Sequence, residues 1–356
     1  MDDRLSAILR RERRIKTVSV LVILASTAII VFAVDFMLVS FVMAFVVNYL
    51  LSPIVNSLER RGLPRQTAIM IPFLSTGVLI GLGIYNLLPV ASTQFTLLES
   101  QLPKYQVDLA NLVSAAEERF KGFSKLYNFS FSQTVNSWVI AQTSALSSSL
   151  PQFISGSMTV LILTPFLAYF MLQDGRRISR TVLSMVPNNL FELALNLHHQ
   201  LNAQMGGFIR ARFLEAAIVG LVVWIGLQIA DFPYAILLGV FAAVTNLIPY
   251  LGPLIGAVPA ILIALISEDA MVTPSISINL FIVTAIYLFA QLIDVALIIP
   301  FVVARIVNLH PVTVIIVIII GSQVMGVLGM MISIPVASAI KLVFQTFYRH
   351  LTELRS

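Results

Sequence analysis

Long apolar stretches separated by short polar connections dominate the pattern of this chain. Six of them are unbroken, and each is long enough to cross about 30 Å of hydrocarbon as an α-helix. They occupy residues 17–34, 36–57, 66–90, 153–172, 211–230 and 276–304. The pattern predicts an all-α polytopic membrane protein, in which lipid rather than water surrounds many of the side chains.

Two further apolar regions, 235–267 and 311–344, are interrupted by glycine and proline. Each half of the first region has about 15 residues, which is short for a full crossing at about 1.5 Å per residue. A straight helix cannot accommodate the prolines between these halves. We therefore predict two re-entrant helical hairpins in an inverted repeat and about eight membrane segments in all, with two complete crossings as the alternative. The residues expected to break the helices are Pro249, Gly252, Pro253 and Gly256 in the first region and Gly326, Gly329 and Pro335 in the second.

Between residues 91 and 152 the chain becomes polar, with charged residues, serine, glutamine and asparagine throughout. We interpret this stretch as a helical module outside the membrane. Five regions result: three transmembrane helices in 1–90, the extracytoplasmic polar module in 91–152, a fourth transmembrane helix with a cytoplasmic amphipathic segment in 153–210, a transport core with broken helices in 211–344, and a cytoplasmic tail in 345–356.

Basic residues predict the orientation. Lysine and arginine concentrate before residue 17, in the loop 58–65, directly after residue 172 and in the C-terminal tail. Short connections rich in these residues face the cytoplasm, so both termini are expected there. The connection that begins Ser267-Glu268-Asp269 has no basic residue, which fits the outside. We predict a multi-pass protein of a bacterial-type inner membrane.

Composition strengthens the membrane assignment. Hydrophobic residues make up 58% of 356 positions, charged residues 11%, and the mean hydropathy is +0.94. A soluble domain of this length would need far more charge to cover its surface. The net charge of +5 belongs mostly to the flanks of apolar segments, so lipid and topology explain it better than nucleic acid. Because the chain has no cysteine, disulfides and cysteine-based metal sites are excluded.

Asp294 is the most informative single residue, because it stands inside the predicted 276–304 helix. A carboxylate at the centre of a bilayer costs roughly 2.5–3.5 kcal/mol on insertion scales, and such residues usually handle protons or cations. Gln291 begins the same run of residues and is a second candidate for ion coupling. The alternative is that the Asp294 side chain only hydrogen-bonds an unwound part of the backbone.

Three further residues are candidates for a solute or ion path. The Pro249–Pro253 segment frees backbone groups that need protein or water partners. Asn246 and Tyr250 could line a solute path there, unless glycine and proline merely bend a buried helix. Glu215 follows Arg212 by three residues, a spacing that favours an ion pair near the cytoplasmic surface, with a gating role as the alternative.

Motifs for other chemistry are missing from the sequence. It has no nucleotide-binding loop, zinc motif or nucleophile elbow. The adjacent His198 and His199 diverge on a helix and cannot face one metal ion together. We therefore expect no catalytic residues, metal site or cofactor, and no enzyme activity.

Two parts of the chain resemble the autoinducer-2 exporter (AI-2E) family of bacterial inner-membrane permeases. The first part contains Tyr169–Arg177, Pro187, Leu237–Gly239 and the most specific piece, Asn246–Pro253. The second part contains Asp294–Pro300, His310, Pro311, Gly326, Gly329 and Pro335. The order of these parts is similar to the family over nearly the whole chain.

The resemblance implies an inner-membrane protein with about eight helices, export of autoinducer-2, Na⁺/H⁺ exchange in some members, and assembly into homo-oligomers. The family often has asparagine after the residue that matches Asp294, whereas Val295 stands here. The carboxylate therefore has one polar neighbour fewer, which weakens the case for cation coordination at this position.

The combined interpretation is a secondary transporter that exports a small polar solute, similar to autoinducer-2, coupled to H⁺ or Na⁺. Its partners would be the lipid bilayer and a small solute or monovalent cation. Within the same class, a monovalent cation/proton antiporter is the alternative. From another class, the alternative is a scaffold whose external module binds partners in the cell envelope.

Overall fold

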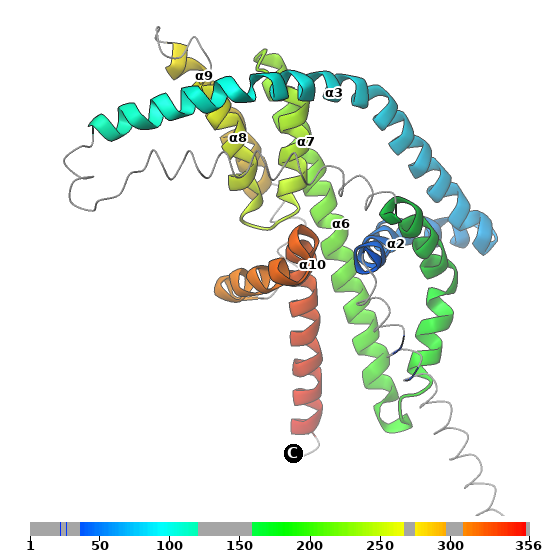
Figure 1. The fold of residues 1–356 in the computed structure, drawn as a ribbon. Coiled ribbons are helices and arrows are strands. Elements are labelled where there is room, and N and C mark those ends of the chain that lie inside the picture. Colours follow the sequence, from blue (N-terminus) through cyan, green and yellow to red (C-terminus); the bar gives the residue numbers. More distant parts are fainter. Residues whose placement is uncertain are drawn as a thin grey trace, which may run out of the picture. The chain divides into compact units, whose positions relative to one another are not determined.

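The structure, a computed structural model, describes Val22, Ser26 and residues 36–119, 159–266, 275–296 and 309–353. The long elements of this part of the chain are helices, and it contains no strand. They are α2 (Met37–Arg60), α3 (Arg65–Arg119), a helix at 159–183, α6 (Phe191–Ile229), α7 (Ala235–Asn246), α8 (Gly252–Ile266), α9 (Ser275–Ile293) and α10 (Pro311–Glu353), with a short 3₁₀ turn, η1 (Asn188–Leu190) (Figure 1).

Four helical stretches in this part of the chain are long and apolar enough to cross a membrane: Met37–Arg60, Arg65–Gln101, Ile278–Ala296 and Val312–Arg349. The all-α polytopic membrane fold is therefore confirmed. The expected first span, 17–34, lies outside the described residues apart from Val22 and Ser26. The same holds for the acidic connection at Ser267–Asp269 and for the basic N-terminus, residues 1–16.

The chain forms two compact units, which are described separately. The first comprises Met1–Leu74, Ile154–Gly206 and Ala337–Ser356. Its core contains Leu51 and Val55 of α2, Ala68 and Ile69 of α3, and Leu172. At the edge of this core, Glu59 accepts hydrogen bonds from Arg65 at 2.8 Å and from Arg176 at 2.9 Å. These ion pairs join α2, the start of α3 and the helix at 159–183.

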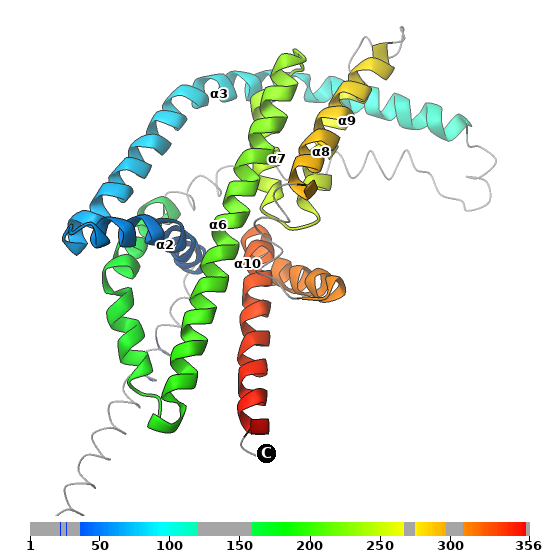
Figure 2. The same cartoon turned by 180° about the vertical axis from the view of Figure 1, so that it is seen from behind.

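The second unit comprises Ser75–Phe153 and Gly207–Val336. Within it, α7, α8 and α9 lie side by side, with α8 between the other two (Figures 1 and 2). Glycines allow α6 to approach its neighbours closely. A Cβ at Gly239 would lie 2.5 Å from the Trp224 side chain, and one at Gly226 would lie 2.8 Å from Ile286. Small residues at helix crossings are typical of packing in membranes.

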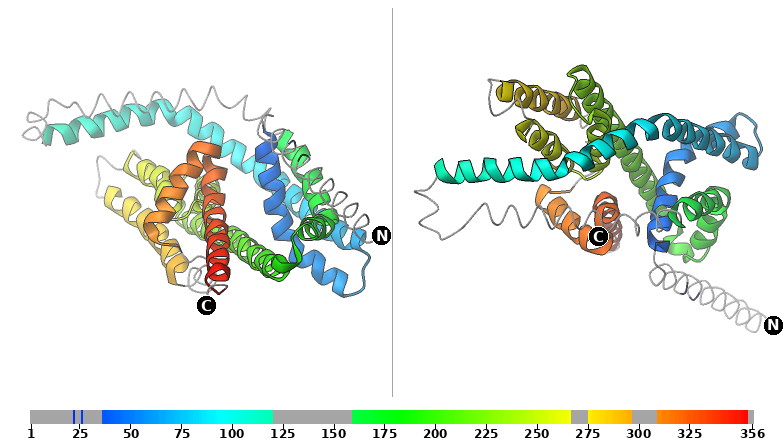
Figure 3. Two further views of the ribbon diagram at one scale, coloured as in Figure 1. Left: turned by 90° about the horizontal axis from the view of Figure 1, so that it is seen from below. Right: turned by 45° about the horizontal axis from the view of Figure 1, so that its top comes forward.

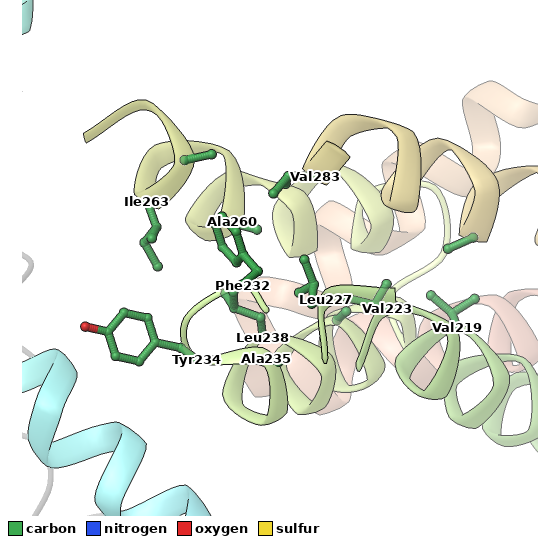
Figure 4. Close-up of a cluster of buried hydrophobic side chains, with 13 residues drawn as sticks. Val219, Val223, Leu227, Phe232, Tyr234, Ala235, Leu238, Ala260, Ile263 and Val283 are labelled. Carbon is green, nitrogen blue, oxygen red and sulfur yellow. The ribbon is translucent and has the colours of Figure 1, made fainter. Parts of the chain in front are cut away.

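The buried cluster of this unit draws side chains from several helices. Val219, Val223 and Leu227 of α6 face Ala260 of α8 and Val283 of α9, and all five are buried (Figure 4). Apolar residues at this spacing put one stripe of α6 against its neighbours. The cluster fixes the distances between the helices that carry the polar residues described below.

The first interrupted region forms the predicted helical hairpin. α7 ends at Asn246 and α8 begins at Gly252, and the two helices contact each other along their length. Pro249 lies in the turn, where its missing N–H cannot continue the α7 ladder. Tyr250 has a φ of +65°, which reverses the chain direction. With 12 and 15 residues, both helices are shorter than a complete span.

The hairpin turn satisfies much of its own backbone. The N–H groups of Leu247, Ile248, Leu251 and Gly252 all donate to backbone oxygens of residues 244–249. The expectation that this segment offers free backbone groups to a solute therefore fails for these four N–H groups. Side chains, rather than the backbone, remain to line a path.

The second interrupted region breaks at one place. Met325 and Gly326 have non-helical φ and ψ angles inside α10, with φ of +58° at Gly326, and α10 turns sharply there (Figure 3). Gly329 and Pro335 were also expected to break the helix, but both lie within the helical arm that follows. Gly329 instead allows the arms to meet, because it contacts the Gly321 backbone.

Two boundaries expected from the sequence do not coincide with helix ends. α3 continues through residue 90 to Arg119 as one helix of 55 residues, so residues 91–119 continue the helix of the third apolar stretch. Likewise, α6 runs unbroken through residue 210. Charge and hydropathy change at these points, but a change from apolar to polar side chains does not by itself end a helix. Residues 120–152 lie outside the described part.

Candidate functional site

A cavity of about 570 Å³ lies within the second unit. Side chains of α6, α7, α8, α9 and α10 line it, together with the hairpin turn. Its volume falls in the range of cavities that bind small molecules. The five residues predicted from the sequence to carry solute or ions all lie on its wall: Glu215, Asn246, Tyr250, Gln291 and Asp294.

The two interrupted regions meet beside this cavity. Ile248 of the first hairpin turn packs with Val314 and Ile318 of the first arm of α10 and with Ile334 of its second arm. Phe208 of α6 completes this buried cluster. The two interrupted regions and Asp294 therefore lie around the same cavity in the structure.

Three charged side chains form the polar centre of the cavity wall. Arg212 and Glu215 of α6 make the predicted ion pair. This pair is buried, with exposed side-chain fractions of 10% and 1%. The Glu215 carboxyl group also lies within hydrogen-bonding reach of Asp294, which is itself 4% exposed. The pairing of the two carboxyl groups could not be read from the sequence.

Asp294 has a distinctive backbone environment. The regular α-helix of α9 ends at Ile293, and residues 294–296 continue as a π-helical turn. Such turns are rare and occur frequently at functional sites. The residue therefore stands where the α-helical hydrogen-bond pattern changes, and not in the middle of a regular helix as the sequence suggested.

Several buried polar atoms of the wall lack a hydrogen-bond partner within the described part of the chain. They are Arg212 Nε, Glu215 Oε2, Asn246 Nδ2, Tyr287 OH and Asp294 Oδ1. Buried polar groups are normally paired, and each exception calls for an explanation. Here the unpaired donors and acceptors belong to residues that line the same cavity. A polar solute or ion in the cavity would give them partners.

The wall also contains polar residues that the sequence analysis did not select. Thr284 and Tyr287 of α9 line the cavity with Gln291 and Asp294. These four residues are spaced by three, four and three positions, so they form one stripe on the helix. That spacing in an otherwise apolar segment was a usable signal for Thr284 and Tyr287.

The break residues have different places at the site. Pro249, Pro253 and Gly256 line the cavity, whereas Gly252 packs against the Thr245 backbone. Tyr250 lies at the turn and is 65% exposed. The described residues contain no group of three or more histidine, cysteine, aspartate or glutamate side chains able to hold a metal ion.

Chemically, the cavity combines apolar walls with an Arg–Glu–Asp cluster and a few neutral polar groups. Such a site can bind a small polar molecule through its unpaired donors and acceptors. It can also hold a proton or a cation at the carboxyl pair, because two carboxylates in contact repel each other unless a positive charge compensates them. Both properties suit transport, in which a site binds its cargo reversibly.

Comparison with known proteins gives a consistent result. The model of the family described as "AI-2E family transporter" matches residues 19–349. Similar proteins include "Putative transport protein YrrI" of Bacillus subtilis, 27% identical over 319 residues that cover 88% of this chain and 87% of the relative. "Putative permease PerM" of Escherichia coli is 26% identical over 337 residues, which cover 93% of each chain. With a family match over nearly its whole length and the fold described above, this chain belongs to the AI-2E transporter family and is a multi-pass membrane protein of the transporter class.

Proposed function

We propose that this protein is a secondary transporter that exports a small polar solute, similar to autoinducer-2, coupled to H⁺ or Na⁺. It would act in a bacterial inner membrane with both termini in the cytoplasm. The cavity of the second unit would bind the solute, and Asp294 would couple its movement to the ion gradient. One observation carries the proposal: the polar residues selected from the sequence line a single cavity of about 570 Å³.

The cavity walls support a small polar solute as the cargo. Asn246 Nδ2 and Tyr287 OH offer unpaired hydrogen-bonding groups, and Gln291 adds an amide on the same wall. A solute with several hydroxyl or carbonyl groups would satisfy them. Leaving such groups unpaired costs about 1–3 kcal/mol each, so a solute that pairs them is favoured over an apolar one.

A monovalent cation/proton antiporter is the second candidate. The close approach of the Glu215 and Asp294 carboxyl groups favours it, since a carboxyl pair can bind a cation in exchange for a proton. The two candidates predict different requirements. The exporter moves an organic solute, whereas the antiporter moves Na⁺ and H⁺ with no solute present.

Flux in liposomes tests the proposal. The purified full chain is reconstituted with autoinducer-2 inside, and its efflux is followed with and without a pH or Na⁺ gradient, while an internal dye reports pH. Gradient-dependent efflux supports the exporter, and Na⁺-dependent pH change without solute supports the antiporter. Absence of any gradient-driven flux would contradict both and favour the scaffold alternative.

The variant Asp294→Asn tests the coupling residue, because it keeps the size of the side chain and removes its charge. Gradient-driven flux should fall by at least about tenfold, the effect of losing a positioned charge in a water-poor site. The matched control is Glu192→Gln, which changes an exposed acidic residue in the first turn of α6. Flux at the unchanged level in Asp294→Asn would remove this residue from the mechanism.

A further inference from the structure

The net charge of the buried cluster depends on one residue. Glu215 and Asp294 contribute two negative charges when ionised, and Arg212 contributes one positive charge. All three side chains are at least nine-tenths buried, so solvent screens them little. The other titratable groups of the cavity wall are the phenols of Tyr250 and Tyr287. The described parts of α7, α8 and α10 place no ionisable side chain on that wall.

We propose that Arg212 fixes the net charge of its cluster with the ionised Glu215–Asp294 pair at minus one, so that the pair exchanges one proton for one monovalent cation and rejects divalent cations. The proposal rests on the ion coupling of the proposed function. It assigns the site at which the coupled ion binds and the valence of that ion. Arg212 acts here as a specificity-determining residue and touches Glu215 directly.

The geometry provides the ligands that such exchange needs. Arg212 occupies the Oε1 oxygen of Glu215, while Glu215 Oε2 and Asp294 Oδ1 are buried without a partner in the described structure. The Asn246 side chain, 1% exposed and also partly unpaired, lines the same cavity. Oxygen atoms of carboxylates and amides are the ligands that hard cations prefer.

Charge balance explains the selectivity. One proton or one Na⁺ brings the cluster to neutrality, and binding Na⁺ to the protonated pair releases that proton to solution. A divalent ion would leave one uncompensated positive charge in a buried site, which is strongly unfavourable. Removing the arginine charge would change the net charge of the cluster from minus one to minus two. The site should then accept a second proton or a divalent ion.

The release of protons on cation binding measures this exchange of proton for cation directly, without transport. NaCl, LiCl, MgCl₂ or choline chloride is added to the purified full chain in detergent at low buffer concentration across the neutral pH range. For the natural sequence, Na⁺ or Li⁺ should release about one proton per chain, because cation binding displaces protons from its ligands. Mg²⁺ and choline should release none, and Glu192→Gln, the exposed acidic control, should respond as the natural sequence does.

Four variants separate the roles. Glu215→Gln and Asp294→Asn should each abolish Na⁺-dependent release. In Arg212→Gln, Mg²⁺ should release about two protons per chain, since the cluster then lacks its internal cation. Arg212→Lys retains the charge and should keep the monovalent response. It provides the comparison if Arg212→Gln does not fold, as judged by gel filtration and melting temperature.

Three results would overturn the inference. The first is the absence of proton release by Na⁺ or Li⁺ from the folded natural chain. The second is a folded Arg212→Gln protein that still ignores Mg²⁺, and the third is a folded Arg212→Lys protein that loses the Na⁺ response. If liposomes show solute export but the first result is found, the inference fails and the proposed function stands. If release occurs but no flux is seen, the proposed function fails and the charge assignment stands.

Discussion

Gly256 of α8 lies directly against Thr245 of α7: a Cβ at position 256 would stand 2.7 Å from Thr245 Oγ1. Thr245 is buried, and its hydroxyl donates to the Phe241 carbonyl at 2.9 Å. The side chain therefore cannot move aside without losing a buried hydrogen bond. This contact sets the distance between the arms of the first hairpin, and with it one wall of the cavity.

The first prediction concerns this contact. Gly256→Ala should destabilise the protein by about 1–3 kcal/mol, because added atoms in a well-packed site force neighbours apart. Its melting temperature should fall, and Thr245→Ala in the same chain should restore part of the loss. The matched control is Gly81→Ala in α3, where a Cβ meets no atom within 4 Å. Equal melting temperatures for Gly256→Ala and Gly81→Ala would contradict the prediction.

The second prediction concerns the turn in α10. Gly326 has φ of +58° and ψ of −136°, a combination that residues with a Cβ rarely adopt. Gly326→Ala should cost about 1–3 kcal/mol of stability, although a Cβ there meets no neighbouring atom. Gly326→Asn should not rescue it, because asparagine tolerates the left-handed helical region and not this ψ. A melting temperature for Gly326→Ala as high as that of Gly83→Ala would count against backbone strain as the cause.

The third prediction concerns Tyr287 on the cavity wall. Its hydroxyl is buried without a partner in the described structure, so Tyr287→Phe should leave the melting temperature unchanged or raise it slightly. If the hydroxyl binds the solute, the apparent KM for efflux should rise about tenfold, the value of one lost hydrogen bond. Tyr85→Phe, at a site 78% exposed in α3, provides the control. An unchanged KM would place the solute away from Tyr287.

The fourth prediction concerns the link between the polar end of α3 and the first hairpin. The hydroxyl groups of Tyr105 and Tyr234 form a hydrogen bond of 3.3 Å, and the Tyr234 ring projects its hydroxyl out of the apolar cluster (Figure 4). A double-mutant cycle with Tyr105→Phe and Tyr234→Phe should give a coupling of about 0.5–1.5 kcal/mol in thermal unfolding. Additive effects of the two changes would mean that the bond contributes nothing.

The same tyrosine pair predicts how stability depends on pH. Burial, followed by the hydrogen bond with Tyr234, raises the pKa of Tyr105 above its usual value. The folded protein therefore holds this proton at a pH where the unfolded chain releases it. Its contribution is fully present below about pH 10, the usual tyrosine pKa, and is lost as the pH rises beyond it. The fall in melting temperature between about pH 9 and pH 11 should be smaller in Tyr105→Phe; an identical fall would contradict this assignment.

Much of the candidate site could be predicted from the sequence because its signals are local. Asp294 stands out as a charge in an apolar segment, and Asn246 and Tyr250 flank the prolines of a broken helix. The Arg212–Glu215 pair follows from a spacing of three on one helix. Each inference needs only the neighbours along the chain.

Other features could not be predicted. Gly329 and Pro335 have the residue types of helix breakers, yet only the backbone at Met325 and Gly326 leaves the helical region. Proline can stay inside a membrane helix when neighbouring groups compensate for its missing N–H. Nor did the loss of hydropathy after residue 90 end α3, because polar residues with good helix propensity continue a helix as well as apolar ones do.

The sequence by itself determined the membrane class, the positions of the long apolar helices and the interruption at Pro249, since these follow from hydropathy and from backbone chemistry. Only the tertiary structure decided that Glu215 meets Asp294. Glu215 lies on α6 and Asp294 directly follows α9. These helices run antiparallel (Figure 2) and contact each other where Gly226 meets Ile286. The register between two helices depends on how their side chains interlock, and no spacing within either segment contains that information.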